Sequence, residues 1–371
     1  MLKVSDLFIG LMSGTSFDGI DVALVQFSGS KLELLATHLH PLPESIKQQL
    51  LTLSLHQLHD LHQVYRLDIE LALVFADAVN TLLTKSKRSP QDIAAIGSHG
   101  QTLRHFPHQP YPYTLQIGDP HVLTVNTDIT VVADFRRRDL ALGGQGAPLA
   151  PLFHQAFMYS PHENRAIVNI GGFANVTLLP IDLAIPILGF DTGPGNVLMD
   201  AWTRDHFNQP YDHNGELARL GEVNQDLLSA LLADAFFQQR PPKSTGRDDF
   251  NSKWLQTRLA PYGHLSTHDV LATLTELTAR SIIDAVKQCS RSNAIYICGG
   301  GAANTFLMER LQHHAGAVKV KSTSVLGIDP NWVEAMLMAY LAQQRLLHRK
   351  LNLADITGSR SSHLVGTIYS S

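Results

Sequence analysis

The sequence predicts an α/β protein of two domains. Its 371 residues exceed the length at which a single hydrophobic core usually stops growing. A pattern of strand, glycine-rich loop, strand and strand occurs near the N-terminus and again after residue 148. The two copies share this pattern without residue identity, so we interpret them as a weak internal repeat.

Short apolar or loosely alternating segments predict the strands. These are 7–10, 20–27, 32–38, 93–97, 165–170, 176–179, 185–190 and 294–298. Helical periodicity then predicts helices at 43–53, 58–85, 223–238, 266–289 and 332–347, one from residue 196 to about 207 and another from about 304.

The domain boundary is predicted near residues 130–145, with the C-terminal helix packing back on the first domain. The predicted domains are therefore 1–135 together with 331–371, and 136–330. The tail after Arg349 has weak periodicity, so we expect it to lie on the surface or to be loosely held.

The composition is that of a globular protein in the cytoplasm. Hydrophobic residues make up 44% and charged residues 17%, and the net charge is −4. This mild acidity argues against nucleic-acid binding, which needs a basic surface. The sequence shows neither an 18-residue apolar run nor a signal-peptide pattern, so no membrane partner is expected. The two cysteines, Cys289 and Cys298, are expected to pack as small apolar side chains.

Glycine-rich segments follow several predicted strands, around Gly14, Gly171, Gly193 and Gly299. A turn explains each one taken alone. As a set they predict nucleotide binding, because phosphates need close backbone N–H donors and small polar side chains. Those side chains are Thr15, Ser16, Asn175, Thr192 and Asn196. The motifs of P-loop kinases, serine hydrolases and zinc peptidases (GxxxxGK[ST], GxSxG and HExxH) are absent from the sequence.

Acidic residues beside these loops could carry chemistry. Two interpretations of Asp18 are open, a turn cap or a Mg²⁺ contact through water. For Asp191 we favour chemistry, because its predicted loop lies between a buried strand and the start of a helix. His99 and Gln101 offer hydrogen bonds to a polyhydroxy ligand. Glu334, in the first turn of the last helix, either complements the helix dipole or points into a cleft.

Colinear motifs along nearly the whole chain resemble those of anhydro-N-acetylmuramic acid kinases. They are GLMSGTSFDGID at 10–21, GSHGQT at 97–102, QIGDP at 116–120, DFRRRD at 134–139, GGQGAP at 143–148, NIGG at 169–172, GFDTGPGN at 189–196, TGRD at 245–248, CGGG at 298–301 and EA at 334–335. The resemblance implies two ribonuclease H-like domains flanking an ATP cleft, the fold of actin-like ATPases, sugar kinases and heat-shock chaperones. It also implies a homodimer that opens an anhydro sugar hydrolytically and phosphorylates it in cell-wall recycling.

The same resemblance assigns roles to individual residues. Asp191 is the expected general base, and Asp18 the expected contact of Mg²⁺ through water. The residues expected to bind ATP are Ser13, Gly14, Thr15, Ser16, Asp18, Gly19, Gly171, Gly172, Gly193, Gly195, Asn196, Gly299, Gly300, Gly301 and Asn304. The residues expected to bind the sugar are Ser98, His99, Gln101, Arg136, Arg138 and Glu334. Either Arg136 or Arg138 could bind the lactyl carboxylate, since an arginine fork suits a carboxylate.

Other functions compete with this one. Another sugar kinase of the same superfamily would phosphorylate a free hydroxyl without opening a ring. A nucleotide-dependent binding module would need a peptide-binding appendage or a basic helix-turn-helix, and the sequence shows neither. A glycosidase would need two carboxylates at a defined separation, which a sequence does not reveal.

Overall fold

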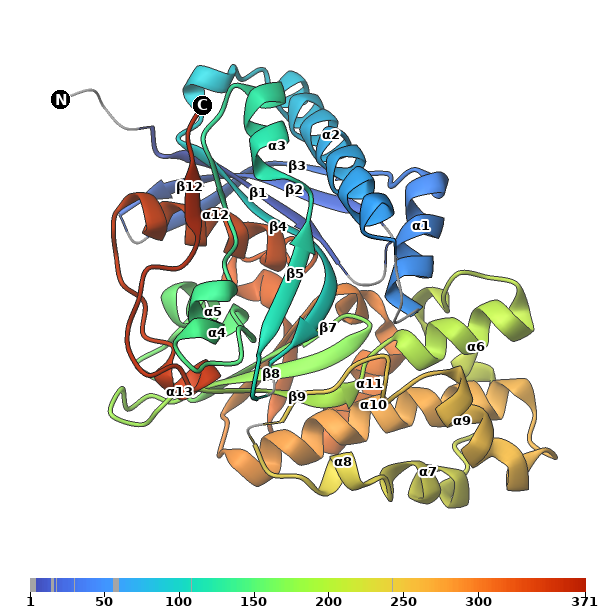
Figure 1. The fold of residues 1–371 in the computed structure, drawn as a ribbon. Helices are drawn as coiled ribbons and strands as arrows, with labels where there is room; N and C mark the ends of the chain where they lie inside the picture. The colour runs from blue at the N-terminus through green and yellow to red at the C-terminus, as the bar shows by residue number, and fades with distance from the viewer. Residues whose placement is uncertain are drawn as a thin grey trace. The chain divides into compact units, whose positions relative to one another are not determined.

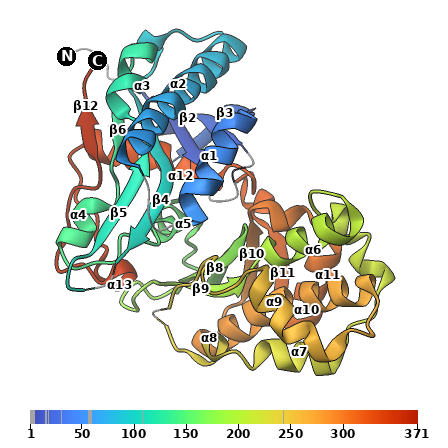
Figure 2. The same ribbon diagram turned by 45° about the vertical axis from the view of Figure 1, so that its right-hand side comes forward.

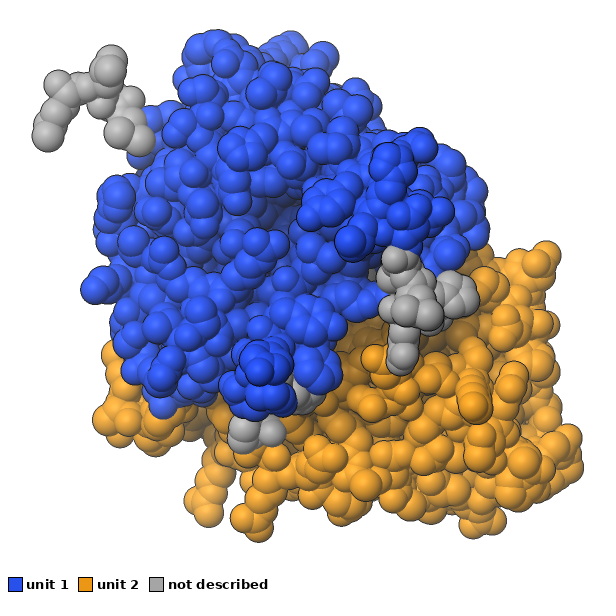
Figure 3. Space-filling model, in the orientation of Figure 1, with its two compact units in different colours: residues 1–157, 332–371 blue, residues 158–331 orange. Residues whose placement is uncertain are grey.

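The chain folds into two compact units. The computed structural model describes residues 5–14, 17, 19–29, 31–55, 60–107, 109–241 and 243–371. The first unit comprises residues 1–157 and 332–371, and the second comprises 158–331 (Figure 3). Compared with the domains predicted from the sequence, the segment 136–157 lies in the first unit. Its Phe157 ring packs there against Tyr340, with ring centroids 5.3 Å apart.

The first unit is built on a mixed sheet (Figure 1). Its strands are β1 (Leu7–Ser13), β2 (Ile20–Ser28), β3 (Lys31–His40), β4 (Ala95–Phe106), β5 (Tyr113–Ile117), β6 (Val131–Ala133) and β12 (Thr367–Tyr369). The spatial order is β12-β6-β4-β1-β2-β3, with β5 paired to β4. Strands β1, β2 and β3 form an antiparallel meander, whereas β1, β4 and β6 run parallel.

Helices cover both faces of this sheet. They are α1 (Glu44–Leu55), α2 (Leu61–Ser86), α3 (Pro120–Thr127), α4 (Arg137–Ala141), α5 (Ala150–Met158), α12 (Val333–Leu346) and α13 (Ala354–Thr357). Ile9 and Leu11 of β1 share a core with Phe75 of α2, which lies beside α3 and α1 in Figure 2. Gly10, between them in β1, faces Ala335 of α12. Because successive strand residues point to opposite faces, α2 and α12 pack on opposite sides of the sheet.

The second unit repeats this plan. Its strands are β7 (Arg165–Ile170), β8 (Phe173–Leu179), β9 (Leu188–Pro194), β10 (Ala294–Cys298) and β11 (Lys319–Ser322). Its helices are α6 (Val197–Phe207), α7 (Gln225–Leu232), α8 (Ala235–Gln238), α9 (Ser252–Leu259), α10 (Thr267–Cys289) and α11 (Thr305–Ala315). The apolar faces of β7 and β10 share a core with α10 and α11.

Both units therefore have the same sheet topology. The second sheet has the order β11-β10-β7-β8-β9, in which β7, β8 and β9 form an antiparallel meander and β7, β10 and β11 run parallel. The first unit has the equivalent order β6-β4-β1-β2-β3. This duplication confirms the predicted repeat and the predicted class of two ribonuclease H-like units.

Several local predictions were wrong. Residues 98–102 were expected in a loop, but they continue β4, and residues 191–194 likewise belong to β9. Polar and glycine residues persist in these strands because neighbouring strands supply their hydrogen-bond partners. The predicted helix 223–238 is two helices, α7 and α8. Of the two alternatives predicted for the tail after Arg349, it is bound to the first unit and not loosely held, because β12 pairs antiparallel with β6.

Both cysteines are free thiols, and Cys298 is buried in β10 as predicted, while Cys289 is half-buried. Across the described part of the chain, we find no helix whose length and apolar content would let it cross a bilayer.

Candidate active site

Asp191 lies within β9 of the second unit, between the buried residues Phe190 and Thr192. Its carboxylate Oδ2 accepts a hydrogen bond from the backbone N–H of Thr245 at 3.0 Å. Its own N–H donates to the carbonyl of Lys243 at 3.1 Å. Burial raises the pKa of Asp191 to about 6, although the Thr245 N–H and the Lys243 charge oppose the rise. A carboxylate with this pKa is suited to accept a proton near neutral pH.

The segment beside Asp191 contains the TGRD motif, for which the sequence predicts no role. Lys243 packs its ammonium group 4.4 Å from the centroid of the Phe236 ring and donates to the Phe236 carbonyl at 3.1 Å. Lys243 is thereby anchored, and its backbone and that of Thr245 hold Asp191. The sequence does show a lysine two residues before the TGRD motif. Its link to Asp191 is not visible there, because that link depends on contacts across 50 residues of chain.

Gly171 and Gly172 form the tight connection between β7 and β8. Their carbonyls accept hydrogen bonds from the N–H groups that begin α6. These bonds are Asn196 to Gly171 at 2.8 Å, and Gly195 and Val197 to Gly172 at 2.9 and 3.0 Å. A Cβ added at Gly171 or Gly172 would meet its nearest atom at 3.7 or 3.9 Å, an ordinary contact. Internal packing therefore does not require glycine at these two half-buried positions. A ligand that approaches the backbone closely would give a reason for glycine there.

Gly193 and Gly195, by contrast, have structural reasons to be glycine. Gly193 has φ +140°, and a Cβ there would lie 2.8 Å from the Phe237 ring. A Cβ at Gly195 would overlap the Gly171 carbonyl oxygen. The N–H groups of Gly195 and Asn196 are already hydrogen-bonded to the carbonyls of Gly172 and Gly171. These hydrogen bonds stabilise the loop at Gly171 and Gly172. Nucleotide binding by Gly193, Gly195 and Asn196 stays a prediction.

The glycines after β10 also include some that packing requires and one that packing does not require. Gly299 has φ +77°, and Cβ atoms at Gly299 and Gly301 would overlap Asn169 and Ile170 of β7. Gly300 has open space, its added Cβ lying 3.9 Å from Asn196 Nδ2. Asn304 is the N-cap of α11, its Oδ1 accepting the Leu307 N–H at 3.0 Å. Of these residues, Gly300 is the one whose identity packing leaves unexplained.

The segment predicted to form the first phosphate loop follows β1 in the first unit. Ser13 Oγ donates to Gln101 Oε1 at 2.6 Å, and both side chains are buried. The two residues pair across the parallel strands β1 and β4. Gly14 begins a turn in which its carbonyl accepts the Phe17 N–H at 3.3 Å, and Gly19 precedes β2. The predicted residues Thr15, Ser16 and Asp18 lie outside the described residues.

His99, which is buried, pairs with the half-buried Arg136 in the first unit. His99 Nδ1 is 2.9 Å from the Gly100 carbonyl, which can only accept, so Nδ1 carries the proton. His99 Nε2 therefore accepts from Arg136 Nε at 3.0 Å and Nη2 at 2.8 Å. Burial, assisted by the Arg136 charge, lowers the pKa of His99 to about 3. His99 is thus a neutral acceptor with a defined tautomer.

Arg136 keeps hydrogen-bonding capacity for a ligand. Its Nη1 donates to the Gly146 carbonyl at 2.7 Å. A guanidinium has five N–H bonds, and among the described residues two are donated to His99 and one to Gly146, which leaves two. Burial lowers the pKa of Arg136 to about 10, while the Glu334 and Asp139 charges favour its protonated form. Arg136 is therefore a fixed cation at neutral pH.

The other predicted sugar-binding residues occupy different environments. Arg138 is exposed on α4, and Glu334 is half-buried in the first turn of α12, within electrostatic range of Arg136. Ser98 is buried, and its Oγ finds no hydrogen-bond partner in the described part of the chain. The structure thus groups His99, Arg136 and Glu334, and it places Arg138 on the surface.

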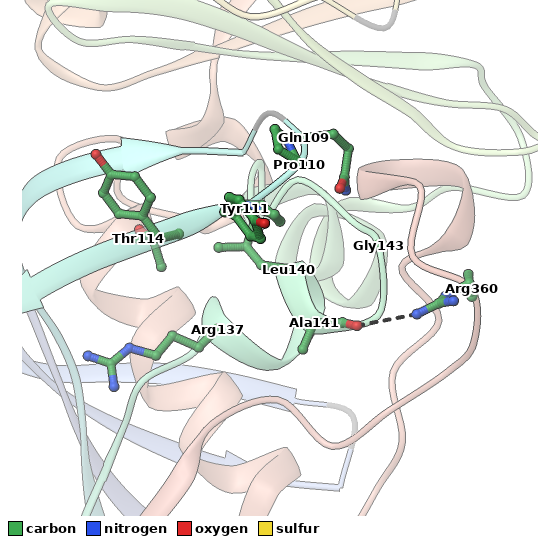
Figure 4. A pocket seen from close by; sticks show the side chains of 11 residues that line it. Gln109, Pro110, Tyr111, Thr114, Arg137, Leu140, Ala141, Gly143 and Arg360 are labelled. Atoms are coloured by element: carbon green, nitrogen blue, oxygen red, sulfur yellow. Dashed lines mark hydrogen bonds between the residues drawn. The ribbon is translucent and has the colours of Figure 1, made fainter.

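A cavity of about 860 Å³ lies beside α4 in the first unit (Figure 4). Its lining includes Tyr111, Tyr113, Leu140, Arg137 and Arg360. None of the predicted site residues that the structure describes lines it. Arg137, which was not among the predicted site residues, lies between the predicted Arg136 and Arg138.

The described residues were searched for side chains that could bind a metal ion together. Among them, no three or more His, Cys, Asp or Glu side chains form a group able to hold a metal ion. The residue predicted to contact Mg²⁺, Asp18, is outside this set.

Comparison with known proteins gives one consistent family. The family model for anhydro-N-acetylmuramic acid kinase matches residues 6–371. The chain is 47% identical over 363 residues to the anhydro-N-acetylmuramic acid kinase of Coxiella burnetii (strain Dugway 5J108-111), covering 98% of this chain and 97% of that protein. It is 46% identical to the enzyme of the same name from Shewanella putrefaciens, with 98% of each chain covered.

The comparison with solved structures also finds more distant proteins. The activator of 2-hydroxyisocaproyl-CoA dehydratase from Clostridium difficile is 10% identical, with 93% of this chain and 99% of that chain covered, at a TM-score of 0.49. The assignment of the fold therefore depends on the strand order of the two sheets.

Proposed function

Because the chain belongs to the anhydro-N-acetylmuramic acid kinase family, we propose that it converts 1,6-anhydro-N-acetylmuramic acid, ATP and water into N-acetylmuramic acid 6-phosphate and ADP. In this reaction water forms the new bond to the anomeric carbon as the bond from that carbon to O6 breaks. O6 then forms the bond to the γ-phosphorus, and ADP leaves. One proton must be removed from the attacking water.

The observation that carries this proposal is the environment of Asp191. Its carboxylate is held by the Thr245 N–H, and burial raises its pKa to about 6. At pH 7 the group is mainly ionised, so it can accept the proton of water. Its raised pKa makes it a stronger base than an exposed aspartate. A kinase acting on a free hydroxyl would use such a base for the hydroxyl proton, so it is the family membership that favours the hydrolytic reaction.

The nucleotide is proposed to bind at positions where packing leaves the glycine unexplained. Gly171, Gly172 and Gly300 allow close approach by a phosphate, because a Cβ at each would make no close contact within the protein. When bound, Mg²⁺ neutralises phosphate charge during transfer. We propose that it is carried by the nucleotide, with Asp18 contacting it through water, while the backbone around Gly172 orients the phosphates.

The sugar is proposed to bind through the first unit. The two remaining N–H bonds of Arg136 suit the lactyl carboxylate, and Arg136 is already oriented by His99 and Gly146. Arg138, exposed and able to move, is the weaker candidate because ordering it would cost side-chain entropy. A homodimer and a cytoplasmic location are further parts of this proposal.

Isotope incorporation tests the reaction. We expect the product formed in H₂¹⁸O to carry one heavy oxygen at the anomeric hydroxyl, as measured by mass spectrometry soon after mixing. Unlabelled N-acetylmuramic acid 6-phosphate kept in the same water gives the background of spontaneous exchange. A product labelled no faster than this background would contradict ring opening by water and favour a kinase acting on a free hydroxyl.

The pH profile of turnover should report Asp191. Because the base acts only when ionised, kcat should level off above pH 6 and fall about tenfold per pH unit well below the Asp191 pKa. Saturating sugar and Mg²⁺–ATP keep the pH dependence of ligand binding out of the profile, so kcat reports groups of the bound complex. A flat profile from pH 7 to pH 5 would remove Asp191 from the rate-limiting step.

A further inference from the structure

The end of the chain forms a C-terminal strap, residues 351–371, on the first unit. Leu351 bridges His363, and β12 pairs with β6. Between these points the strap contacts the end of α4 and the loop after it. Gln145 N–H donates to the Thr357 carbonyl at 2.9 Å, and Arg360 N–H donates to the Leu142 carbonyl at 3.0 Å. The strap therefore contributes backbone bonds to the connection between α4 and α5.

Asp139 links the strap to this loop. Its carboxylate is fully buried, with Oδ1 accepting from Thr357 Oγ1 at 2.8 Å and Oδ2 accepting from the Gly146 N–H at 2.7 Å. His363 Nε2 is 3.8 Å from Oδ1. A buried carboxylate is costly unless hydrogen-bond donors such as Thr357 Oγ1 and the Gly146 N–H surround it, so the positions of these groups depend on one another.

The loop is shaped around the same carboxylate. Gly144 donates its N–H to the Asp139 carbonyl at 2.9 Å, and a Cβ at Gly144 would overlap the carboxylate. Further along the loop, the Gly146 carbonyl accepts a hydrogen bond from Arg136 Nη1 at 2.7 Å. One continuous series of hydrogen bonds thus runs from Thr357 through Asp139 and Gly146 to Arg136.

We propose that Asp139 and Thr357 are positioning residues that orient Arg136 toward the carboxylate of the sugar. This inference rests on the proposed function, because it takes Arg136 as the sugar-binding cation. Thr357 touches no reacting atom in this account. It holds Asp139, which holds Gly146, and the Gly146 carbonyl stops the guanidinium from rotating about its contact with His99. A pre-oriented cation binds a carboxylate with less loss of entropy.

Thr357→Val is the central test, because it removes the hydroxyl at nearly constant volume. We expect the Kd of the anhydro sugar, measured by calorimetry, to rise about tenfold to a hundredfold, with the Kd of ADP unchanged. Thr357→Ser keeps the hydroxyl and should restore binding. Thr367→Val, on the exposed face of the same strap, is the matched control and should bind like the unsubstituted protein.

A double-mutant cycle separates positioning from a general structural effect. In an Arg136→Gln background, Thr357→Val should weaken sugar binding no further, because its effect passes through the guanidinium. Equal losses for sugar and nucleotide, or a full loss in the Arg136→Gln background, would overturn the proposal. If the unsubstituted protein binds no anhydro sugar, the proposed function fails instead, and the two failures are distinct.

A measurement on the unsubstituted protein covers the case in which Thr357→Val does not fold. In ligand-free protein labelled with ¹⁵N, a scalar coupling across the hydrogen bond should join Arg136 Nε to His99 Nε2. Its presence shows that the guanidinium is oriented before the sugar arrives. An Arg136 side chain that exchanges freely with solvent and lacks this coupling would contradict the proposal.

Discussion

Replacing Asp191 with asparagine is expected to lower kcat by at least about a hundredfold, the scale of losing a general base. Asparagine has nearly the same volume, and its side-chain oxygen can still accept the Thr245 N–H that now bonds Oδ2. The fold and the backbone contact to Lys243 should therefore persist. Steady-state kinetics gives kcat, and calorimetry with ADP should show nucleotide binding unchanged.

Asp205→Asn is the matched control for this substitution. Asp205 lies on α6 of the same unit with its side chain exposed, so the variant loses one negative charge without touching β9. Its kcat should equal that of the unsubstituted protein. Near-normal turnover by Asp191→Asn would exclude Asp191 as the base, whereas equal losses in both variants would indicate a general effect of charge.

The second large effect is expected from Gly10→Ala, which should destabilise the first unit by about 3 kcal/mol or more. The added Cβ would overlap the Ala335 carbonyl oxygen of α12 and lie 2.9 Å from the Ala339 nitrogen. Backbone atoms cannot rotate away as a side chain can, so α12 would have to separate from β1. Gly97 of β4 makes the same close approach to Met338, so the helix is in contact at two neighbouring strands.

Hydrogen exchange in increasing urea measures this effect locally. Because the chain has two units, a single unfolding free energy is not defined, and the amides of β1 and α12 report the unit concerned. Gly263→Ala is the control, since Gly263 has φ −59° and open space around a new Cβ. If Gly10→Ala left the exchange of α12 unchanged, the close packing of α12 on β1 would not be a source of stability. Displacement of α12 would also move Glu334, next to Ala335 in the chain.

Local sequence pattern was sufficient for the repeated architecture. The apolar strands and the glycine loops that follow them appear in order in both halves, and both sheets have the topology that this order implies. The long helices α2 and α10 were predicted from their own periodicity, since each carries an apolar stripe that any core will bury. Asp191 was also singled out, because an acid between a buried strand and a helix start is visible without coordinates.

Local pattern failed where partners come from elsewhere in the chain. Residues 98–102 resemble a loop because they are polar and contain glycine, yet Gln101 of that segment is satisfied by Ser13 of the neighbouring strand. The strap was expected to lie on the surface or to be loosely held, because its periodicity is weak. Its order comes from β6, α4 and the buried Asp139 carboxylate, all of which lie more than 200 residues earlier.

The residues alone thus predicted two similar α/β halves with glycine loops, because these features depend on neighbours in the chain, and they singled out Asp191 as a candidate base. Packing in three dimensions decided which groups of the site are already engaged. It made His99 a neutral acceptor, gave Arg136 one orientation and separated the glycines required by packing, Gly195 and Gly299, from those left open. Burial and hydrogen bonding of this kind depend on residues distant in sequence, and no local pattern encodes them.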